Sequence, residues 1–299
     1  MRVLILGGGG MLGHKLWQRL PRRFPDTFVT LRQRHPALAR SGLFNGERVI
    51  EGVDATDFEA LDALLARLKP QTVINCIAVT KRREQADDPV AANTLNALLP
   101  HRLHRWARAN EARLINFSTD CVFAGATGNY TEASTPDATD VYGRTKALGE
   151  IDAAHALTLR LSIIGREIEH RTELLEWFLM QDGGEPVKGF RNALYTGVST
   201  LYLADLVAEL IERFHDLAGL YQVAAETISK YDLLLLARAA FGVDVAIEPV
   251  DRPVIRRNLN GERFRRATGC TPPPWREMMA ALAADPTPYA AWRTTDAVR

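Results

Sequence analysis

The chain has 299 residues, of which 46% are hydrophobic and 24% are charged, close to the averages of folded globular proteins. Its 37 Lys and Arg residues balance 36 Asp and Glu residues, so the charge provides no electrostatic footprint for nucleic acid or an anionic membrane. No apolar run approaches the ~20 residues of a membrane span and no secretory leader precedes the first predicted strand, so we expect a soluble protein without either partner.

Apolar runs alternate with segments of helical periodicity from the first residues onward, and this alternation predicts parallel β-α-β units. The expected strands cover 3–6, 27–31, 48–54, 71–78, 112–118 and 157–165, and the expected helices between them cover 11–20, 58–68 and 90–109. Such apolar strands suit a sheet covered on both faces. The predicted fold class is therefore α/β, with a Rossmann-type doubly wound parallel sheet.

The rhythm changes after residue 165 to helices joined by loops, with helix candidates at 174–180, 203–214 and 231–241. This part is interpreted as a smaller mixed α/β substrate lobe, packed on the carboxyl edge of the sheet. The predicted division is a dinucleotide-binding domain over 1–160 and a mainly substrate-binding lobe over 161–299, whose chain is free to cross back to the sheet.

The stretch GGGGMLG (7–13) lies between the first predicted strand and the first helix. Glycine there allows a sharp turn and a close approach of the backbone to a pyrophosphate. Its spacing is G-x-x-G-x-x-G, and in this context we predict dinucleotide binding rather than a purely structural turn. The expected cofactor contacts are Gly7, Gly10, Met11, Leu12 and Gly13, together with Ala78 at the end of the fourth strand.

The end of the second strand indicates which dinucleotide is bound, because an acid there would bind the ribose hydroxyl of NAD. Arg32 and Arg34 occur instead, so NADPH is predicted and NADH is the alternative cofactor. A solvated basic loop is the structural alternative for both arginines. Asp54 is a candidate for the adenine amino group, although it could equally be a turn residue; Asp57 fits an N-cap better.

Two further stretches carry polar groups to the expected carboxyl edge. INFSTDCVF (115–123) ends an apolar strand in Thr119 and Asp120, and VYGRTKALGE (141–150) holds Tyr142 and Lys146 four residues apart on one helix face. A cation beside a phenol can lower the phenol pKa towards neutral pH. The three cysteines are odd in number and widely spaced, which favours a cytoplasmic protein with at least two buried thiols, and neither they nor the histidines have zinc-ligand spacing.

These motifs resemble the extended short-chain dehydrogenases/reductases, and most closely their dTDP-4-dehydrorhamnose reductase branch. The resemblance rests on GGGGMLG, INFSTDCVFAG, VYGRTKALGE and LRLSIIG, and more weakly on RPVIRRNL and TGCTPPPW, so it spans nearly the whole chain. It implies catalytic roles for Thr119, Tyr142 and Lys146. It also implies that Asn93, with Asn96 close by in the register, supports a water near the lysine and the cofactor.

The implied reaction is hydride transfer from NADPH to the 4-keto group of a nucleotide-linked deoxysugar. Tyr142 would donate the proton, Thr119 would hydrogen-bond the same oxygen, and Lys146 would hold the nicotinamide ribose and lower the pKa of Tyr142. The related 4,6-dehydratases have Thr-Asp-Glu where this chain has Cys121 in third position. We therefore expect reduction without dehydration, and no neighbouring histidine activates Cys121 as a nucleophile.

The substrate is less well defined by the sequence. The expected substrate contacts are Thr119, Asp120, Lys81, Arg191 and Arg252; Lys188, Arg256 and Arg257 are further cations of the second lobe, and surface solvation explains most of these charges equally well. The chain departs from the rhamnose reductase pattern at Val79-Thr80-Lys81-Arg82-Arg83 and at Ser162-Ile163-Ile164. The sugar therefore stays open.

Two other functions stay open beside the reductase. The regulatory subunit of methionine adenosyltransferase resembles the same branch, so the chain could be an NADP-binding interaction subunit. A sugar-nucleotide epimerase would instead retain its cofactor through each turnover. The intact set of Thr119, Tyr142 and Lys146 favours catalysis, and a homodimer is compatible with each function.

Overall fold

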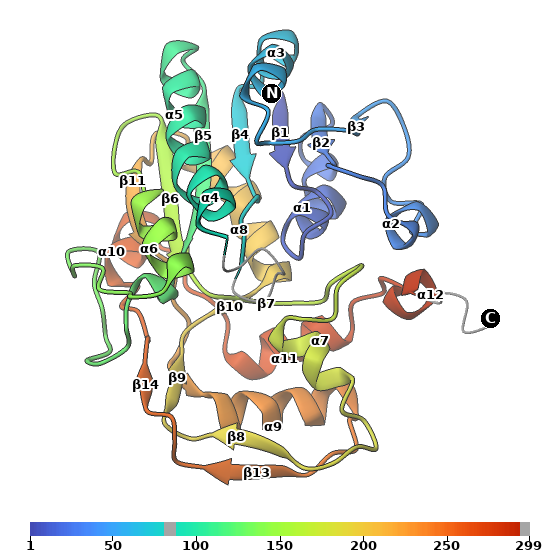
Figure 1. Ribbon diagram of the computed structural model, residues 1–299, viewed down its shortest axis with the longest axis vertical. Helices are drawn as coiled ribbons and strands as arrows, with labels where there is room; N and C mark the ends of the chain where they lie inside the picture. The colour runs from blue at the N-terminus through green and yellow to red at the C-terminus, as the bar shows by residue number, and fades with distance from the viewer. Residues whose placement is uncertain (81–87, 294–299) are drawn as a thin grey trace.

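The computed structural model describes residues 1–80 and 88–293 (Figure 1). Within these residues seven parallel strands form the central sheet, in the order β11-β6-β5-β4-β1-β2-β3. They are β1 (Val3–Leu6), β2 (Thr27–Thr30), β3 (Val49–Ile50), β4 (Thr72–Asn75), β5 (Arg113–Thr119), β6 (Ala156–Leu161) and β11 (Gly219–Gln222). The predicted Rossmann-type sheet is confirmed, and its order reverses between β1 and β4, where such sheets open a crevice.

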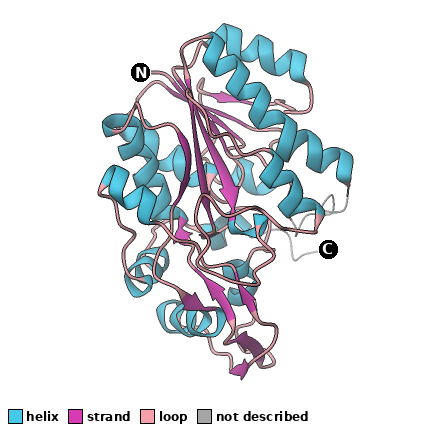
Figure 2. Cartoon of the chain, turned by 90° about the vertical axis from the view of Figure 1, so that its left-hand side faces the viewer, coloured by secondary structure: helices cyan, strands magenta, loops and turns pink. Residues whose placement is uncertain are grey.

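Helices cover both faces of the sheet (Figure 2). β1 is apolar throughout because Val3 and Ile5 pack into the core on one face, whereas Leu4 and Leu6 pack into the core on the other. The covering helices are α1 (Gly13–Arg19) and α8 (Thr200–Arg213) on the first face, and α3 (Phe58–Leu68) and α5 (Leu99–Ala109) on the second. Other short elements beside the sheet are η1 (Leu20–Arg22), α2 (Pro36–Arg40), η3 (Asp120–Val122), α6 (Val141–Leu148) and α10 (Glu262–Thr268).

The helix expected over 90–109 is interrupted by a π-helical stretch. α4 (Pro89–Ala92) runs into η2 (Asn93–Leu98), and α5 follows directly. Pro100 lacks the N–H that would bond the Asn96 carbonyl in a continuous α-helix, which favours a change of hydrogen-bond pattern at this point. This change from α-helical to π-helical hydrogen bonding decides whether Asn93 or Asn96 points into the protein.

The smaller lobe lies below the carboxyl ends of the strands in Figure 1. Its strands are β7 (Ile163–Ile164), β8 (Val187–Phe190), β9 (Ala193–Tyr195), β10 (Val198–Ser199), β12 (Ile228–Ser229), β13 (Ile247–Val250) and β14 (Ile255–Arg256). Its helices are α7 (Leu174–Leu179), α9 (Lys230–Phe241), α11 (Trp275–Ala283) and α12 (Tyr289–Arg293). β11 and α8 follow residue 160 but belong to the sheet and its cover, so the chain crosses back to the sheet after that point.

The strand expected over 157–165 breaks at Ser162, whose carbonyl accepts a hydrogen bond from the Val198 N–H at 2.9 Å. The chain leaves the sheet there, and β7 pairs with β10 instead. β11 is the edge strand on that side. Its Leu220 N–H donates to Asp152 at 3.0 Å and its Gln222 N–H donates to Glu132 at 2.8 Å, so carboxylates satisfy part of the sheet edge.

The three thiols are free and partly buried, and Cys76 and Cys270 pack against the main core. They are therefore less completely buried than expected. Within residues 1–80 and 88–293, no group of three or more His, Cys, Asp or Glu side chains is arranged to hold a metal ion. None of the helices in those ranges has both the length and the apolar character that crossing a bilayer requires.

Candidate active site

A cavity of about 450 Å³ lies at the carboxyl ends of β1, β4 and β5 and faces the smaller lobe. This is the crevice that the reversal of strand order creates. Its wall on the sheet side includes Gly10, Met11, Leu12, Ala78, Thr119, Asp120, Cys121, Tyr142 and Lys146. Its wall on the lobe side includes Glu167, Glu173, Tyr195, Lys230 and Arg257. The cavity thus brings the three predicted catalytic residues together with the glycine-rich loop.

The reason why glycine occurs differs from one position of the loop to another. Gly7 has φ +83°, and a Cβ at Gly13 would lie 2.2 Å from the Gly7 carbonyl oxygen, so α1 can approach the loop closely only with glycine there. A Cβ at Gly10 would lie 3.5 Å from that oxygen, an ordinary contact. Protein packing therefore does not require a glycine at position 10, and its bare backbone leaves room on the cavity side.

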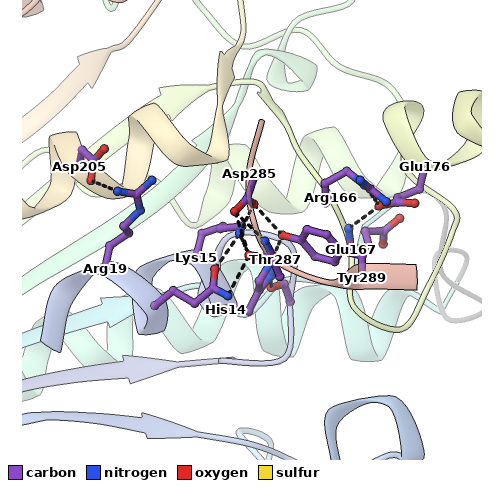
Figure 3. A network of polar contacts seen from close by, with 12 residues as sticks. His14, Lys15, Arg19, Arg166, Glu167, Glu176, Asp205, Asp285, Thr287 and Tyr289 are labelled. Atoms are coloured by element: carbon purple, nitrogen blue, oxygen red, sulfur yellow. Dashed lines mark hydrogen bonds and ion pairs between the residues drawn. The ribbon is translucent and has the colours of Figure 1, made fainter. Parts of the chain in front are cut away.

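The loop is held from behind by a buried polar cluster that reaches the end of the described chain (Figure 3). Nδ1 of His14 lies 2.9 Å from the Gly10 carbonyl oxygen, and Nε2 lies 2.8 Å from the Tyr289 hydroxyl. Burial and the charge of Lys15 lower the pKa of His14 to about 3, so the ring is neutral and has one N–H. Since a carbonyl can only accept, Nδ1 donates to Gly10 and Nε2 accepts from Tyr289.

Lys15 is also buried, and it forms an ion pair with Asp285 and donates to Thr287 at 2.9 Å (Figure 3). Burial lowers the pKa of Lys15, whereas the hydrogen bond from Lys15 lowers the pKa of Asp285 against the effect of its own burial. The segment that contains Asp285 and Tyr289 is therefore fixed to α1, directly behind the glycine-rich loop.

The residues proposed to choose the dinucleotide lie outside the cavity lining. Arg32 and Arg34 are both exposed, and Arg34 donates to the Phe44 carbonyl and forms a 2.9 Å ion pair with Glu51. Asp54 accepts from the N–H and hydroxyl of Thr56 at 2.9 and 2.7 Å, and these bonds lower its pKa. Its carboxylate thus closes a turn, the alternative considered from the sequence.

Thr119 ends β5 and caps η3. Its hydroxyl accepts from the Cys121 N–H at 3.1 Å and donates to Asp120 at 3.2 Å. A hydrogen bond also joins its side chain to the Tyr142 hydroxyl. Thr119 and Asp120 are both buried, so their orientation is fixed by the protein rather than by solvent. The end of β5 and the start of α6 therefore present the two hydroxyls of Thr119 and Tyr142 to the cavity.

Tyr142 lies in the first turn of α6, which Asp140 caps by accepting from the Gly143 N–H at 2.9 Å. Burial raises the pKa of Tyr142, the charges of Cys121 and Asp120 raise it further, and the Thr119 hydrogen bond lowers it. The shift is opposite to the expected one because Lys146 turns towards β5 and burial dominates. The phenol consequently holds its proton at neutral pH and can donate it.

Lys146 donates to the Phe117 carbonyl at 2.6 Å. Burial lowers its pKa to about 8, and the negative charge of Glu150 opposes that shift. Glu150 accepts from Ser118 at 2.5 Å and from two nitrogens of Arg160 at 2.7 and 2.6 Å. The sequence reasoning missed Glu150, although it stands four residues after Lys146 within the same VYGRTKALGE stretch.

Asn96, rather than Asn93, is the asparagine that faces α6, and the expected register is corrected accordingly. Asn96 is fully buried, and its amide donates to the Val79 carbonyl at 3.0 Å and to the Thr145 hydroxyl at 3.1 Å. Asn93 is exposed and donates to the Pro89 carbonyl at 2.7 Å. The π-helical stretch directs Asn96 to the segment that precedes the cavity at Ala78.

The lobe supplies only some of the cations that the sequence named. Arg191 is exposed and pairs with Asp251 at 3.1 Å, Arg252 is exposed, and neither lines the cavity. Lys81 lies outside the described residues. Arg257, named from the sequence as a further cation of the lobe, does line the cavity, and so does Lys230, which the sequence reasoning did not name. Charge alone could not single them out, because exposed arginines look the same in a sequence.

Lys230 and Arg257 are both held against neighbouring groups. The ammonium of Lys230 lies 3.8 Å from the centroid of the Tyr195 ring, a cation–π contact. Arg257 donates to the Phe123 carbonyl at 2.7 Å and contacts the Cys121 sulfur at 3.8 Å. Burial raises the pKa of Tyr195, so its hydroxyl is neutral. The lobe wall therefore offers two cations and a phenol to a ligand.

A family model described as the RmlD substrate binding domain matches residues 1–287. Methionine adenosyltransferase 2 subunit beta from Xenopus tropicalis is 24% identical over 287 residues, which cover 92% of this chain and 78% of that protein. The dTDP-4-dehydrorhamnose reductase from Streptomyces griseus is 36% identical over 150 residues, which cover 50% of this chain and 43% of the reductase. The chain thus matches less than half of the length of that reductase.

The fold is similar to solved structures of sugar-nucleotide enzymes. A dTDP-4-dehydrorhamnose reductase from Bacillus anthracis str. Ames, solved in complex with NADP, superposes with a TM-score of 0.78 at 18% identity. The similarity covers 94% of this chain and 98% of that chain. At this identity the likeness establishes the arrangement of the sheet and the smaller lobe.

Proposed function

Because the chain belongs to the family of the RmlD substrate-binding domain, we propose that it is an NADPH-dependent reductase of the 4-keto group of a nucleotide-linked deoxysugar. One observation carries this proposal: the hydrogen-bonded hydroxyls of Thr119 and Tyr142 line the same cavity as Lys146 and the glycine-rich loop. A carbonyl beside that pair would meet one proton donor and one further hydrogen-bonding group. A protein that only bound the dinucleotide would need neither the proton donor nor the second hydrogen-bonding group.

The residues of the loop fit a dinucleotide. Gly10 faces the cavity, and packing does not require a glycine there, so its bare backbone suits the close approach of a pyrophosphate. Arg32 would bind the 2′-phosphate of NADPH, and NADH remains the alternative. Lys146 would hold the nicotinamide ribose. The bound dinucleotide supplies the hydride; the NADP complex of the Bacillus anthracis reductase supports this choice.

Tyr142 and Thr119 act on the carbonyl oxygen. Tyr142 donates its proton as negative charge develops on that oxygen. Thr119 turns its single hydroxyl hydrogen from Asp120 to the same oxygen, and this hydrogen bond strengthens with the charge. Because the pKa of Tyr142 is raised, its phenol is protonated at neutral pH before the reaction begins. The ammonium of Lys146 places a positive charge on the same side of the cavity, which favours the developing alkoxide, and the negative charge of Glu150 keeps that ammonium protonated to higher pH.

The nucleotide diphosphate requires cations from the lobe. Arg257 and Lys230 line the same cavity as the catalytic groups, and both are held by neighbouring groups in advance of binding. Arg presents a planar fork to phosphate oxygens, whereas Lys acts as a point charge. We assign them to the diphosphate in place of Arg191 and Arg252.

The test is NADPH oxidation with dTDP-4-dehydrorhamnose, followed by nicotinamide absorbance, with a Tyr142→Phe variant as control. We expect one NADPH oxidised per sugar reduced, and a fall in kcat of about 10²- to 10⁴-fold in the variant, because general acid catalysis is lost. NADPH binding, measured by calorimetry, should be little changed. Release of NADP after each turnover would distinguish the reductase from an epimerase.

A second candidate is a regulatory subunit, which the match to methionine adenosyltransferase 2 subunit beta over 92% of this chain favours. In that case the protein would bind NADPH but oxidise it with no 4-keto sugar nucleotide. Tight NADPH binding without turnover, unaffected by Tyr142→Phe, would therefore overturn the reductase proposal.

A further inference from the structure

Glu173 brings a carboxylate from the smaller lobe into the catalytic cavity. It is half-buried, stands directly before α7 and lines the same cavity as Thr119 and Tyr142. The Thr80 hydroxyl, in the loop that follows β4, donates to it at 3.4 Å. Its charge also raises the pKa of both Tyr142 and Tyr195, so the carboxylate lies within electrostatic range of the reacting position.

The backbone of Glu173 is fixed by a second acid, Glu167. The Glu167 carboxylate is buried and accepts from the Thr172 N–H at 3.0 Å and from the Glu173 N–H at 2.8 Å. Two charge-assisted hydrogen bonds to one carboxylate oxygen therefore fix the backbone from which the Glu173 side chain extends. A solvated surface acid would need no such support.

α7 itself is held by Glu176, whose carboxylate is buried beside the cluster of Figure 3. Glu176 accepts from Arg166 at 2.6 Å, from the Glu167 N–H at 3.1 Å, and from two nitrogens of Arg293 at 2.7 and 2.6 Å. Arg293 belongs to α12, so the end of the described chain fixes α7 and, with it, Glu173, which directly precedes this helix. The carboxylate is positioned before any ligand binds.

A carboxylate at this place opposes the reaction in one respect. Asp120 and Glu173 both disfavour negative charge near Tyr142, and the reduction creates negative charge on the carbonyl oxygen. Such a cost is offset if the carboxylate binds the substrate. An ionised carboxylate only accepts hydrogen bonds, so it matches the hydroxyl groups of a sugar.

We infer that Glu173 is a specificity-determining residue, whose carboxylate accepts a hydrogen bond from a hydroxyl on the ring carbon next to the reacting carbonyl. This inference rests on the proposed function. In a 6-deoxysugar, the carbon on one side of the 4-keto group bears the methyl group, which cannot donate. The 3-hydroxyl on the other side is therefore the group that donates a hydrogen bond to Glu173.

The experiment compares dTDP-4-dehydrorhamnose with its 3-deoxy counterpart on wild type, Glu173→Ala and Glu173→Gln. Wild type should prefer the hydroxylated sugar by about 10- to 100-fold in kcat/KM, the range of a hydrogen bond to a charged group. Glu173→Ala should reduce this preference to about twofold or less. Glu173→Gln keeps an acceptor oxygen, so its preference for the hydroxylated sugar should lie between those of wild type and Glu173→Ala. Glu185→Gln removes the same charge at an exposed position and should behave as wild type.

Binding of both sugars is measured by calorimetry in the presence of NADP, and the melting temperature of each variant checks its folding. An alanine variant that is folded and discriminates as strongly as wild type would overturn the inference. Wild type that binds the hydroxylated sugar preferentially without reducing it would overturn the proposed function alone. Wild type that binds neither sugar would overturn both.

Discussion

The two walls of the cavity are built differently. On the sheet side, Thr119, Tyr142 and Lys146 come from one strand end and one helix, and their contacts are mostly with residues of that same side. On the lobe side, Glu173, Lys230 and Arg257 come from segments far apart in sequence. The chemistry is thus set by local motifs, whereas the substrate wall depends on long-range contacts such as that of Arg293 with Glu176.

The largest effect should come from breaking the support of the lobe wall. Glu176→Gln removes the charge that pairs with both Arg166 and Arg293, and loss of one partner of a buried ion pair costs about 3–5 kcal/mol. We expect a lower melting temperature and a higher KM for the sugar nucleotide. Calorimetry and steady-state kinetics measure both, with Glu185→Gln as control. If the variant is destabilised but binds the sugar nucleotide as wild type does, the support of α7 by Glu176 does not affect substrate binding.

A smaller effect should follow from changing the charge behind the sheet wall. Lys146 has its pKa lowered to about 8, and Glu150 acts against this lowering. The ammonium is present below that pKa and lost as pH rises through it, so activity should fall above about pH 8. In Glu150→Gln the pKa of Lys146 should be lower still, and the alkaline limb of kcat/KM should move to lower pH.

The control for this pH profile is Glu262→Gln, which removes a carboxylate from an exposed position. Its alkaline limb should coincide with that of wild type. If the limb of Glu150→Gln also stays in place while the protein remains folded, Lys146 is not the group that titrates.

The smallest effect concerns the choice of cofactor, at the outer end of the sheet wall. Arg32 is exposed, whereas Arg34 is engaged with Glu51 and the Phe44 carbonyl. Arg32→Ala should therefore weaken NADPH relative to NADH by about tenfold, the loss of one charge-assisted contact. Arg34→Ala should change the preference less. Ratios of kcat/KM for the two cofactors measure both, and an equal loss in both variants would mean that the loop rearranges on binding.

The sequence predicted the sheet wall well for a physical reason. A parallel strand covered on both faces is apolar at every position, as β1 is, and the helix over 58–68 begins after the predicted N-cap Asp57. Glycines at a close strand-to-helix approach leave a clear signal, and Gly13 is required by its distance to Gly7. These signals depend only on neighbours in sequence.

The errors arose where the determinant is distant or irregular. Asn93 was preferred to Asn96 because a regular helix was assumed, whereas Pro100 favours the π-helical stretch that turns Asn96 inwards. Arg191 and Arg252 were chosen by charge, which says nothing about where a loop folds. Glu173 follows a segment without periodicity, and its position depends on hydrogen bonds that no local pattern reveals.

The edge strand β11 has a consequence for assembly. Many proteins pair with a second copy by adding its strand to an open sheet edge. Here the Leu220 and Gln222 N–H groups already donate to Asp152 and Glu132 of the same chain. A continuous sheet through β11 of two molecules would have to displace both carboxylates, so a homodimer of this protein should use another surface.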